Sequence, residues 1–146
     1  MRIGNCWVFA MSVVLAGSAL AQSPDAIDRA ANNFAHENIV CAAYFFVVGA
    51  CFKNDKHPDS KTLSEQYLGM ATRAYSTGEL ATKAAGLMPE TVKARFDIAV
   101  DGFKKDIGGN CANISLVFKH AGGCKSLMEK PEERLNALVQ EAEKLQ

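Results

Sequence analysis

The most apolar stretch of the chain runs from Ile39 to Phe52, reads IVCAAYFFVVGACF and contains no charged residue. Apolar residues also recur before it, mostly at intervals of three, four or seven, which places them on one face of a helix. The opposite face is polar before residue 39 and apolar after it. A helix that is apolar all round must be enclosed by neighbours or by lipid. The pattern predicts one long, central helix with an inner face made of Ile27, Ala30, Phe34, Cys41, Phe45, Val48 and Phe52.

The length of this stretch favours a core helix over a membrane span. Fourteen helical residues extend about 21 Å, whereas the hydrocarbon layer of a bilayer is about 30 Å thick. Ser23 suits the N-cap position and Pro24 suits the first helical position, so the helix is expected to begin there. The turn-forming residues of KNDKHPDSK, positions 53–61, are expected to end it.

A second helix is predicted from Thr62 to about residue 85. Thr62 and Glu65 have the spacing of a capping box, and Gly86 followed by Pro89 is typical of a helix end. Gly78 lies in the middle of the helix, where glycine disfavours helix formation by about 1 kcal/mol relative to alanine. We interpret it as a bend. The expected inner face consists of Leu63, Tyr67, Met70, Ala71, Ala74, Ala81 and Ala85.

Three further helical segments complete the prediction. Residues 89–107 carry the most regular apolar stripe, residues 111–121 form a shorter helix that Gly122-Gly123 ends or bends, and residues 131–146 form a short amphipathic helix. The predicted fold is therefore all-α: an up-down bundle of four main helices, stapled by disulfides, with a short C-terminal fifth helix. The stripe of the third helix consists of Val92, Phe96, Ala99, Val100, Phe103 and Ile107.

Residues 1–21 have the pattern of a cleaved signal peptide. Arg2 gives a positive start, Trp7 to Leu15 is apolar, and Ala19-Leu20-Ala21 has the small-x-small pattern of a cleavage site. The mature chain, residues 22–146, has the length of one domain. These features predict a periplasmic or secreted protein that has no membrane span after signal cleavage.

Four cysteines remain after cleavage, and an even number in an exported chain predicts two disulfides. Cys41 and Cys51 lie about 15 Å apart along one helix, whereas a disulfide requires Cα atoms within about 7 Å. Cys111 and Cys124 are excluded as a pair in the same way if their helix is regular to residue 121. Short loops favour antiparallel neighbours, so the late cysteine of the first helix should pair with the early one of the fourth. The predicted bonds are Cys51–Cys111 and Cys41–Cys124.

The charges exclude several classes of partner. Without Arg2 the mature chain carries 15 basic and 16 acidic residues, and neither sign forms a long block. This balance gives no support for binding nucleic acid or an anionic membrane surface. The chain also has no C-x-x-C, no G-x-S-x-G and no phosphate-binding glycine loop. We therefore predict no catalytic residue, no cofactor and no metal.

Two histidines are the remaining candidates for chemistry. His36 lies beside Glu37 in the first helix, where a proton-transfer role is conceivable, but the sequence places no nucleophile near it. His120 and Cys124 are four residues apart, a spacing that puts two metal ligands on one helical face. A closed zinc site needs four ligands, and no second pair is evident. A structural role for Cys124 is favoured.

Aromatic residues give one candidate binding site. Such residues either line an apolar pocket between the first three helices or belong to the core, which is the commoner case. The function best supported by the sequence is that of a non-catalytic exported protein, a chaperone, inhibitor or envelope accessory, that contacts another exported or envelope protein. The alternatives are a carrier of a small apolar ligand and, less well supported, an enzyme with an unrecognised site. The candidate pocket residues are Tyr44, Phe45, Tyr67, Phe96 and Phe103.

Overall fold

The computed structural model describes residues 23–109 and 111–145, and every regular element in this part of the chain is a helix. The prediction of an all-α, disulfide-linked bundle is confirmed. The predicted signal peptide, residues 1–21, lies outside the described residues. The elements are α1 (Pro24–Lys53), α2 (Ser60–Ala84), α3 (Glu90–Asp106), the 3-10 helix η1 (Ile114–His120), α4 (Ala121–Glu129) and α5 (Pro131–Glu143).

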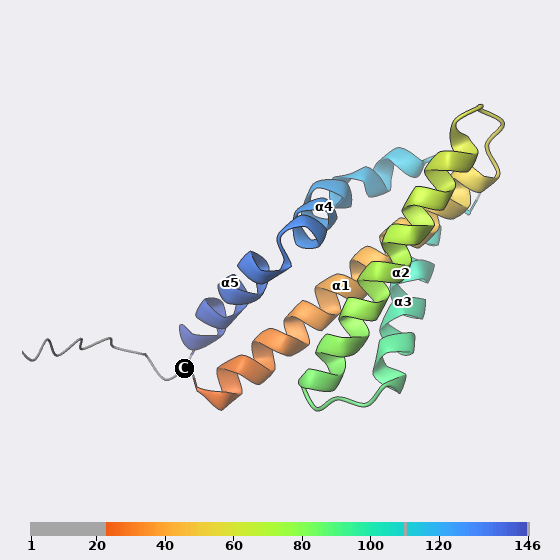
Figure 1. Ribbon diagram of the computed structural model, residues 1–146. Coiled ribbons are helices and arrows are strands. Elements are labelled where there is room, and N and C mark those ends of the chain that lie inside the picture. Colours follow the sequence, from red (N-terminus) through yellow and green to blue (C-terminus); the bar gives the residue numbers. More distant parts are fainter. Residues whose placement is uncertain (1–22, 110, 146) are drawn as a thin grey trace, which may run out of the picture.

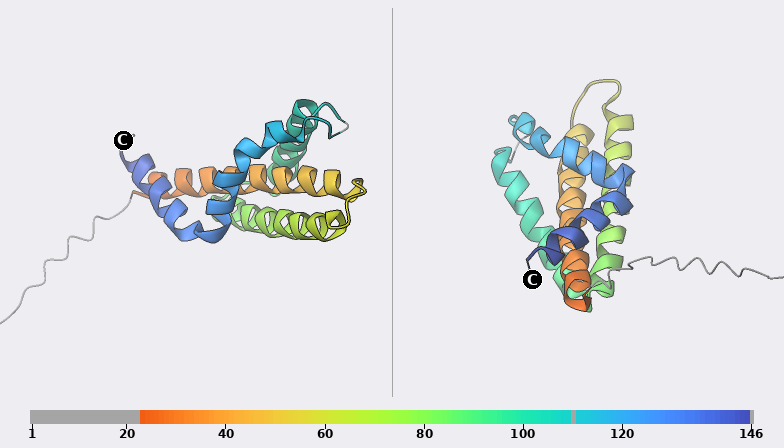
Figure 2. Two further views of the ribbon diagram at one scale, coloured as in Figure 1. Left: turned by 90° about the horizontal axis from the view of Figure 1, so that it is seen from above. Right: turned by 90° about the vertical axis from the view of Figure 1, so that its left-hand side faces the viewer.

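The long helix α1 is the centre of the molecule. It contacts every other element: α2 and α3 pack against it and also touch each other, and η1, α4 and α5 return along it in the antiparallel direction (Figures 1 and 2). By length and composition α1 is apolar enough to cross a membrane, but 72% of its most apolar window is buried inside the bundle. Enclosure by neighbouring helices explains why its polar face disappears after residue 39.

The first turns of α1 differ from the predicted face. Ser23 caps the helix, and its hydroxyl oxygen accepts a hydrogen bond from the backbone N–H of Ala26 at 3.2 Å. Ala26 and Ala30 are fully buried, whereas Ile27 is 45% exposed. Successive helical residues are rotated by about 100°, so a face centred on Ala26 turns Ile27 toward solvent. The prediction that Ile27 faces the core is wrong.

Helices α1 and α2 pack closely because glycine stands at their contacts. Gly78 is buried, and α2 runs through it as one helix rather than ending or breaking there. A Cβ atom at position 78 would lie 2.6 Å from Cδ1 of Ile39, closer than two such atoms can approach. At a second contact, the hydroxyl of Ser64 donates a hydrogen bond to the carbonyl oxygen of Gly49 at 2.8 Å. Gly78 is therefore a point of close approach between helices, a role that its interpretation as a bend does not include.

Helix α2 begins at Ser60, two residues before the predicted capping box. The Ser60 hydroxyl donates to Oδ2 of Asp55 at 3.0 Å across the preceding loop, and Ser60 is buried. This contact orders the first turn without Thr62. Helix α3 follows the prediction more closely: of its stripe, Val92, Val100, Phe103 and Ile107 are buried.

We call residues 111–143 the return arm. Its first part, residues 114–120, is a 3-10 helix, and the chain continues from it directly into α4. Ile114, Val117 and His120 are its less exposed residues, and their spacing of three is the period of a 3-10 helix. The pair Gly122-Gly123 lies inside α4. The prediction that these glycines end or bend a helix at residue 121 is therefore wrong.

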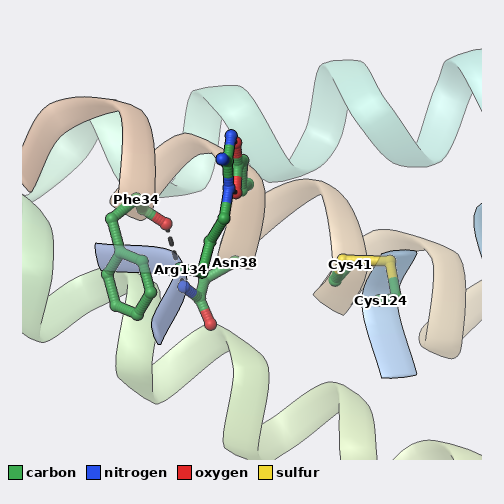
Figure 3. Close-up of a disulfide and its surroundings, with 6 residues drawn as sticks. Phe34, Asn38, Cys41, Cys124 and Arg134 are labelled. Carbon is green, nitrogen blue, oxygen red and sulfur yellow. Dashed lines mark hydrogen bonds and ion pairs between the residues drawn. A yellow bond between two sulfur atoms is a disulfide. The ribbon is translucent and has the colours of Figure 1, made fainter. Parts of the chain in front are cut away.

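Two disulfides join the return arm to α1. Cys41 bonds to Cys124 with 5.3 Å between Cα atoms (Figure 3). Cys51 bonds to Cys111 with 5.7 Å between Cα atoms. These are the nested pairs that the antiparallel argument gives. Cys111 has a φ of 62°, in the left-handed region that non-glycine residues seldom adopt. Two disulfides in one chain indicate an oxidising compartment.

An ion pair fixes the far end of the return arm. The guanidinium of Arg134 on α5 donates from Nη2 to Oε1 of Glu37 at 2.6 Å and from Nε to Oε2 at 2.9 Å. Its Nη1 donates to Glu141 at 3.0 Å. A bidentate pair of this kind is stronger and more directional than a single contact. Figure 3 shows Arg134 near the disulfide of Cys41 and Cys124. Its partner Glu37 precedes Cys41 by four residues, about one turn of α1.

Candidate functional site

The largest depression near the candidate histidines lies between α1, α3 and η1 and has a volume of about 680 Å³. We call it the α1–α3 cleft. His36 comes from α1 and His120 from the end of η1, so the structure brings both histidines into the lining of one cleft. The full lining is Asn32, Asn33, His36, Val40, Arg95, Ile98, Ala99, Gly102, Phe103, Asp106 and His120.

A neighbouring depression of about 490 Å³ lies between α1 and the return arm. It shares His36, Val40 and His120 with the α1–α3 cleft, so the two are adjoining parts of one groove along α1. Its other lining residues include Lys119 and the Glu37–Arg134 ion pair. The groove thus presents apolar, cationic and anionic groups within reach of one bound segment.

Arg95 is the most unusual polar residue in the α1–α3 cleft. Its Nη2 donates a hydrogen bond to Oδ1 of Asn32 at 2.8 Å, but its Nη1 is buried and has no partner among the described residues. A buried donor without a partner disfavours the folded state by about 1–3 kcal/mol, and more when the group is charged. Ile98, also in this cleft, is 73% exposed. The cleft therefore holds a guanidinium with one buried, unpaired nitrogen, which a bound group reaches only when a neighbouring side chain moves, and an exposed apolar side chain from the same helix.

The histidines do not form a catalytic arrangement in the described part of the chain. Burial is the main reason that the pKa of His120 is lowered, and the charge of Lys119 lowers it further. The ring of His120 packs edge-on against Phe103 at 5.1 Å. His36 lines the same cleft as His120.

The described residues hold no cluster of three or more metal-ligating side chains. Of the pair considered from the sequence, Cys124 has its sulfur bonded to Cys41 and is not free to ligate a metal.

A separate depression, between α1, α2 and α4, has a volume of about 360 Å³. We call it the aromatic pocket. Three of the five predicted pocket residues line it together: the ring centroids of Phe45 and Tyr67 are 6.1 Å apart, and those of Tyr44 and Phe45 are 5.2 Å apart. The full lining is Tyr44, Phe45, Tyr67, Met70, Arg73, Ala121, Lys125, Met128 and Glu129.

The other two predicted pocket residues lie elsewhere. Phe103 contacts the Tyr44 ring at 6.2 Å but lines the α1–α3 cleft. Phe96 packs against Phe46 at 5.7 Å and Tyr75 at 5.3 Å, in a separate depression between α1, α2 and α3. The structure therefore distributes the five aromatic residues over three sites around α1.

Tyr44 is the most deeply buried member of the aromatic pocket. It is 1% exposed, and its hydroxyl has no hydrogen-bond partner among the described residues. Burial, with a smaller contribution from the neighbouring Tyr67, raises the pKa of Tyr44 to about 12. Buried hydroxyls are normally hydrogen-bonded, so this one has an unused donor and acceptor.

Alkaline titration should reveal Tyr44. Its pKa is about 12 in the native state against a reference of 10.0, so the neutral phenol is favoured on folding. The contribution of the neutral Tyr44 phenol to the free energy of unfolding is complete below pH 10. It is lost as the pH rises through 12, because the unfolded chain releases this proton first. We expect Tyr44→Phe to remove the last tyrosinate step seen by ultraviolet absorbance. Urea denaturation of this variant should show a smaller loss of stability between pH 10 and pH 12. An unchanged titration curve would contradict the assignment.

The residues that distinguish these sites carry no signal of their own in the sequence. Arg95 is one of several polar positions on a regular amphipathic helix, and its partner Asn32 is 63 residues away. Met70 lies on the predicted inner face of its helix, and no pattern singles out Met128. Only the tertiary arrangement shows that the two methionines share one pocket, and no spacing in the sequence links them.

The chain matches no protein-family model, and no curated protein and no solved structure is significantly similar to it. The fold and the grooves define the class: an all-α, disulfide-linked bundle with several depressions around one central helix. Its function is therefore argued from these sites.

Proposed function

We propose that the protein is a non-catalytic exported protein, periplasmic or secreted, that binds another exported or envelope protein in the α1–α3 cleft. The observation that carries the proposal is the combination in that cleft of a buried, unpartnered Nη1 on Arg95 and a 73% exposed Ile98. Such a protein would act as a chaperone, an inhibitor or an accessory of an envelope machine.

Export is supported by two independent features. Residues 1–21 carry the signal-peptide pattern, and the two disulfides are typical of oxidising compartments. The same disulfides join α1 to the return arm on either side of the cleft's η1 wall, so the cleft is built on a covalently braced frame. A braced site loses less conformational entropy on binding, which favours affinity.

The cleft also indicates what the partner presents. Arg95 needs a second acceptor, and a carboxylate is the acceptor that a guanidinium binds most strongly. Ile98 lies one helical turn along α3 and offers an apolar contact beside it. We therefore propose that the partner inserts a segment in which an acidic side chain, or a terminal carboxylate, is next to an apolar one.

Site-specific photo-crosslinking in the source cells tests this proposal. A photoreactive amino acid at position 98 should give one discrete adduct with an exported protein, which mass spectrometry then identifies. Position 80 is a matched control, because Leu80 on α2 is 70% exposed and lines none of the described depressions. It should give no such adduct.

Two variants complete the experiment. Arg95→Gln should reduce the adduct formed at position 98 about tenfold, the effect of losing one charge-assisted hydrogen bond. Arg29→Gln is the matched control, because Arg29 is exposed on α1 outside the cleft. Equal adducts at positions 98 and 80, or no effect of Arg95→Gln, would overturn the proposal.

A further inference from the structure

The aromatic pocket combines apolar walls with cations at its edge. Arg73 comes from α2 and Lys125 from α4, on two different walls. The Arg73 side chain makes no ion pair or hydrogen bond with any residue that the structure describes. Lys125 has only a distant contact with Glu129, at 3.9 Å, and its side chain is 74% exposed. Two cations are therefore available to one anionic group at the pocket edge.

The interior of the pocket is adaptable. Met70 and Met128 line it from α2 and α4 and are both partly buried. Methionine side chains are unbranched and flexible, and they occur on surfaces that reshape around apolar ligands. The rigid part of the lining is aromatic, and it comes from Tyr44, Phe45 and Tyr67. The pocket thus has a fixed wall and a movable wall.

The hydroxyl of Tyr44 supplies a separate indication of a ligand. It is buried and lacks a partner among the described residues, and Tyr44 is one of the residues that line the pocket. Less than 1 Å² of the oxygen is exposed, so a ligand reaches it only when a lining side chain moves. The two methionines are the lining residues best able to move.

We propose that the aromatic pocket binds a small amphipathic carboxylate. Its apolar body lies between the aromatic residues and the two methionines, and its carboxylate meets Arg73 and Lys125. A polar atom at the inner end of the body hydrogen-bonds to the Tyr44 hydroxyl. The volume of about 360 Å³ is at the small end of the range of ligand pockets, which selects a short chain or a single ring. This site is distinct from the α1–α3 cleft and does not depend on the partner proposed there.

Methyl NMR of the mature chain gives a direct test, because residues 22–146 contain only three methionines. Met70 and Met128 line the pocket, whereas Met88 is 70% exposed between α2 and α3 and serves as an internal control. With methionine methyl groups labelled with carbon-13, titration with sodium octanoate should shift the signals of Met70 and Met128. The Met88 signal should stay in place.

The charge requirement is tested with a neutral probe and a variant. Octanol has the same chain without the carboxylate, and it should bind about tenfold more weakly than octanoate. Arg73→Gln should weaken octanoate binding by about the same factor, that of one charge-assisted hydrogen bond. Arg29→Gln, remote from the pocket, should leave it unchanged. Shifts of all three methionines alike, no shifts at millimolar octanoate, or equal binding of octanol would overturn the proposal.

A second probe tests the role of Tyr44. 8-Hydroxyoctanoate carries a hydroxyl at the end opposite its carboxylate, and it should bind several-fold more tightly than octanoate. This gain should disappear in Tyr44→Phe, which removes one oxygen and leaves the ring in place. If the gain is absent from the wild-type protein, or persists in the variant, Tyr44 does not contact the ligand. All of these outcomes are independent of the crosslink at position 98, so either proposal can fail alone.

Discussion

Removal of the disulfide between α1 and α4, by Cys41→Ala with Cys124→Ala, is expected to lower the free energy of unfolding by about 4 kcal/mol. The bond closes a loop with a sequence separation of 83 residues. In the chain-entropy model such a loop restricts the unfolded chain by about 4.5 kcal/mol, a large share of the roughly 5–15 kcal/mol that stabilise a typical domain. Both cysteines are buried, so their truncation also removes packing. Urea denaturation without reductant measures the effect.

The second bond provides the matched comparison. Cys51–Cys111 closes a loop with a separation of 60 residues, and the chain-entropy model makes its contribution only about 0.3 kcal/mol smaller. The pair Cys51→Ala with Cys111→Ala should therefore be destabilised almost as much. Peptide mapping without reduction checks the pairing itself. A Cys41–Cys111 peptide would require α1 and the return arm to run parallel, and the antiparallel arrangement would be wrong.

Replacement of Gly78 by alanine is expected to lower the free energy of unfolding by about 1–3 kcal/mol, the usual effect of overpacking a core. The new Cβ would lie 2.6 Å from Cδ1 and 2.8 Å from Cγ1 of Ile39, and 3.2 Å from the carbonyl oxygen of Ala35. The side chain of Ile39 is fully buried and has little room to move away. This clash outweighs the gain in helix propensity of about 1 kcal/mol that alanine brings.

Gly69 is the control for this substitution. It lies in the same helix, is exposed, and has no atom within 4 Å of where a Cβ would stand. Gly69→Ala should therefore raise the free energy of unfolding by about 0.5–1 kcal/mol, through helix propensity alone. Opposite signs for the two variants in chemical denaturation support the close contact of α1 and α2. A stabilising Gly78→Ala would show that the helices can separate at no cost.

The parts of the fold that follow from local pattern and chain length could be predicted. The extent of α1 follows from its apolar run and its Ser23-Pro24 start, and the antiparallel order follows from short loops. The 3-10 helix could not be predicted, because over seven residues a period of 3.0 is hardly distinguishable from 3.6. The role of Gly78 could not be predicted either, since only the position of Ile39, 39 residues earlier, distinguishes a contact from a bend.

The candidate sites were predictable only in part, for a related reason. Phe45 and Tyr67 could be grouped because they lie on the predicted inner faces of two adjacent helices, and Tyr44 because it belongs to the stretch that is apolar all round. Phe96 could not be separated from them, because the apolar stripe of α3 does not show how this helix is rotated about its axis relative to α1. The buried cation of Arg95 and the hydroxyl of Tyr44 are properties of the packed molecule, and neither residue type signals them in advance.

The nested disulfides also constrain how the protein is made. Chains emerge from synthesis N-terminus first. Among the four cysteines that form the disulfides, Cys41 and Cys51 therefore appear before Cys111 and Cys124, and oxidation in order of appearance would join them wrongly. The helical conformation of α1 holds these two sulfurs about 15 Å apart and prevents that bond. Early helix formation in α1 is therefore expected to prevent a non-native Cys41–Cys51 bond until Cys111 and Cys124 have been synthesised. A mutation that weakens α1 without touching any cysteine should accordingly increase misoxidised product during biogenesis, even where the finished protein would tolerate it.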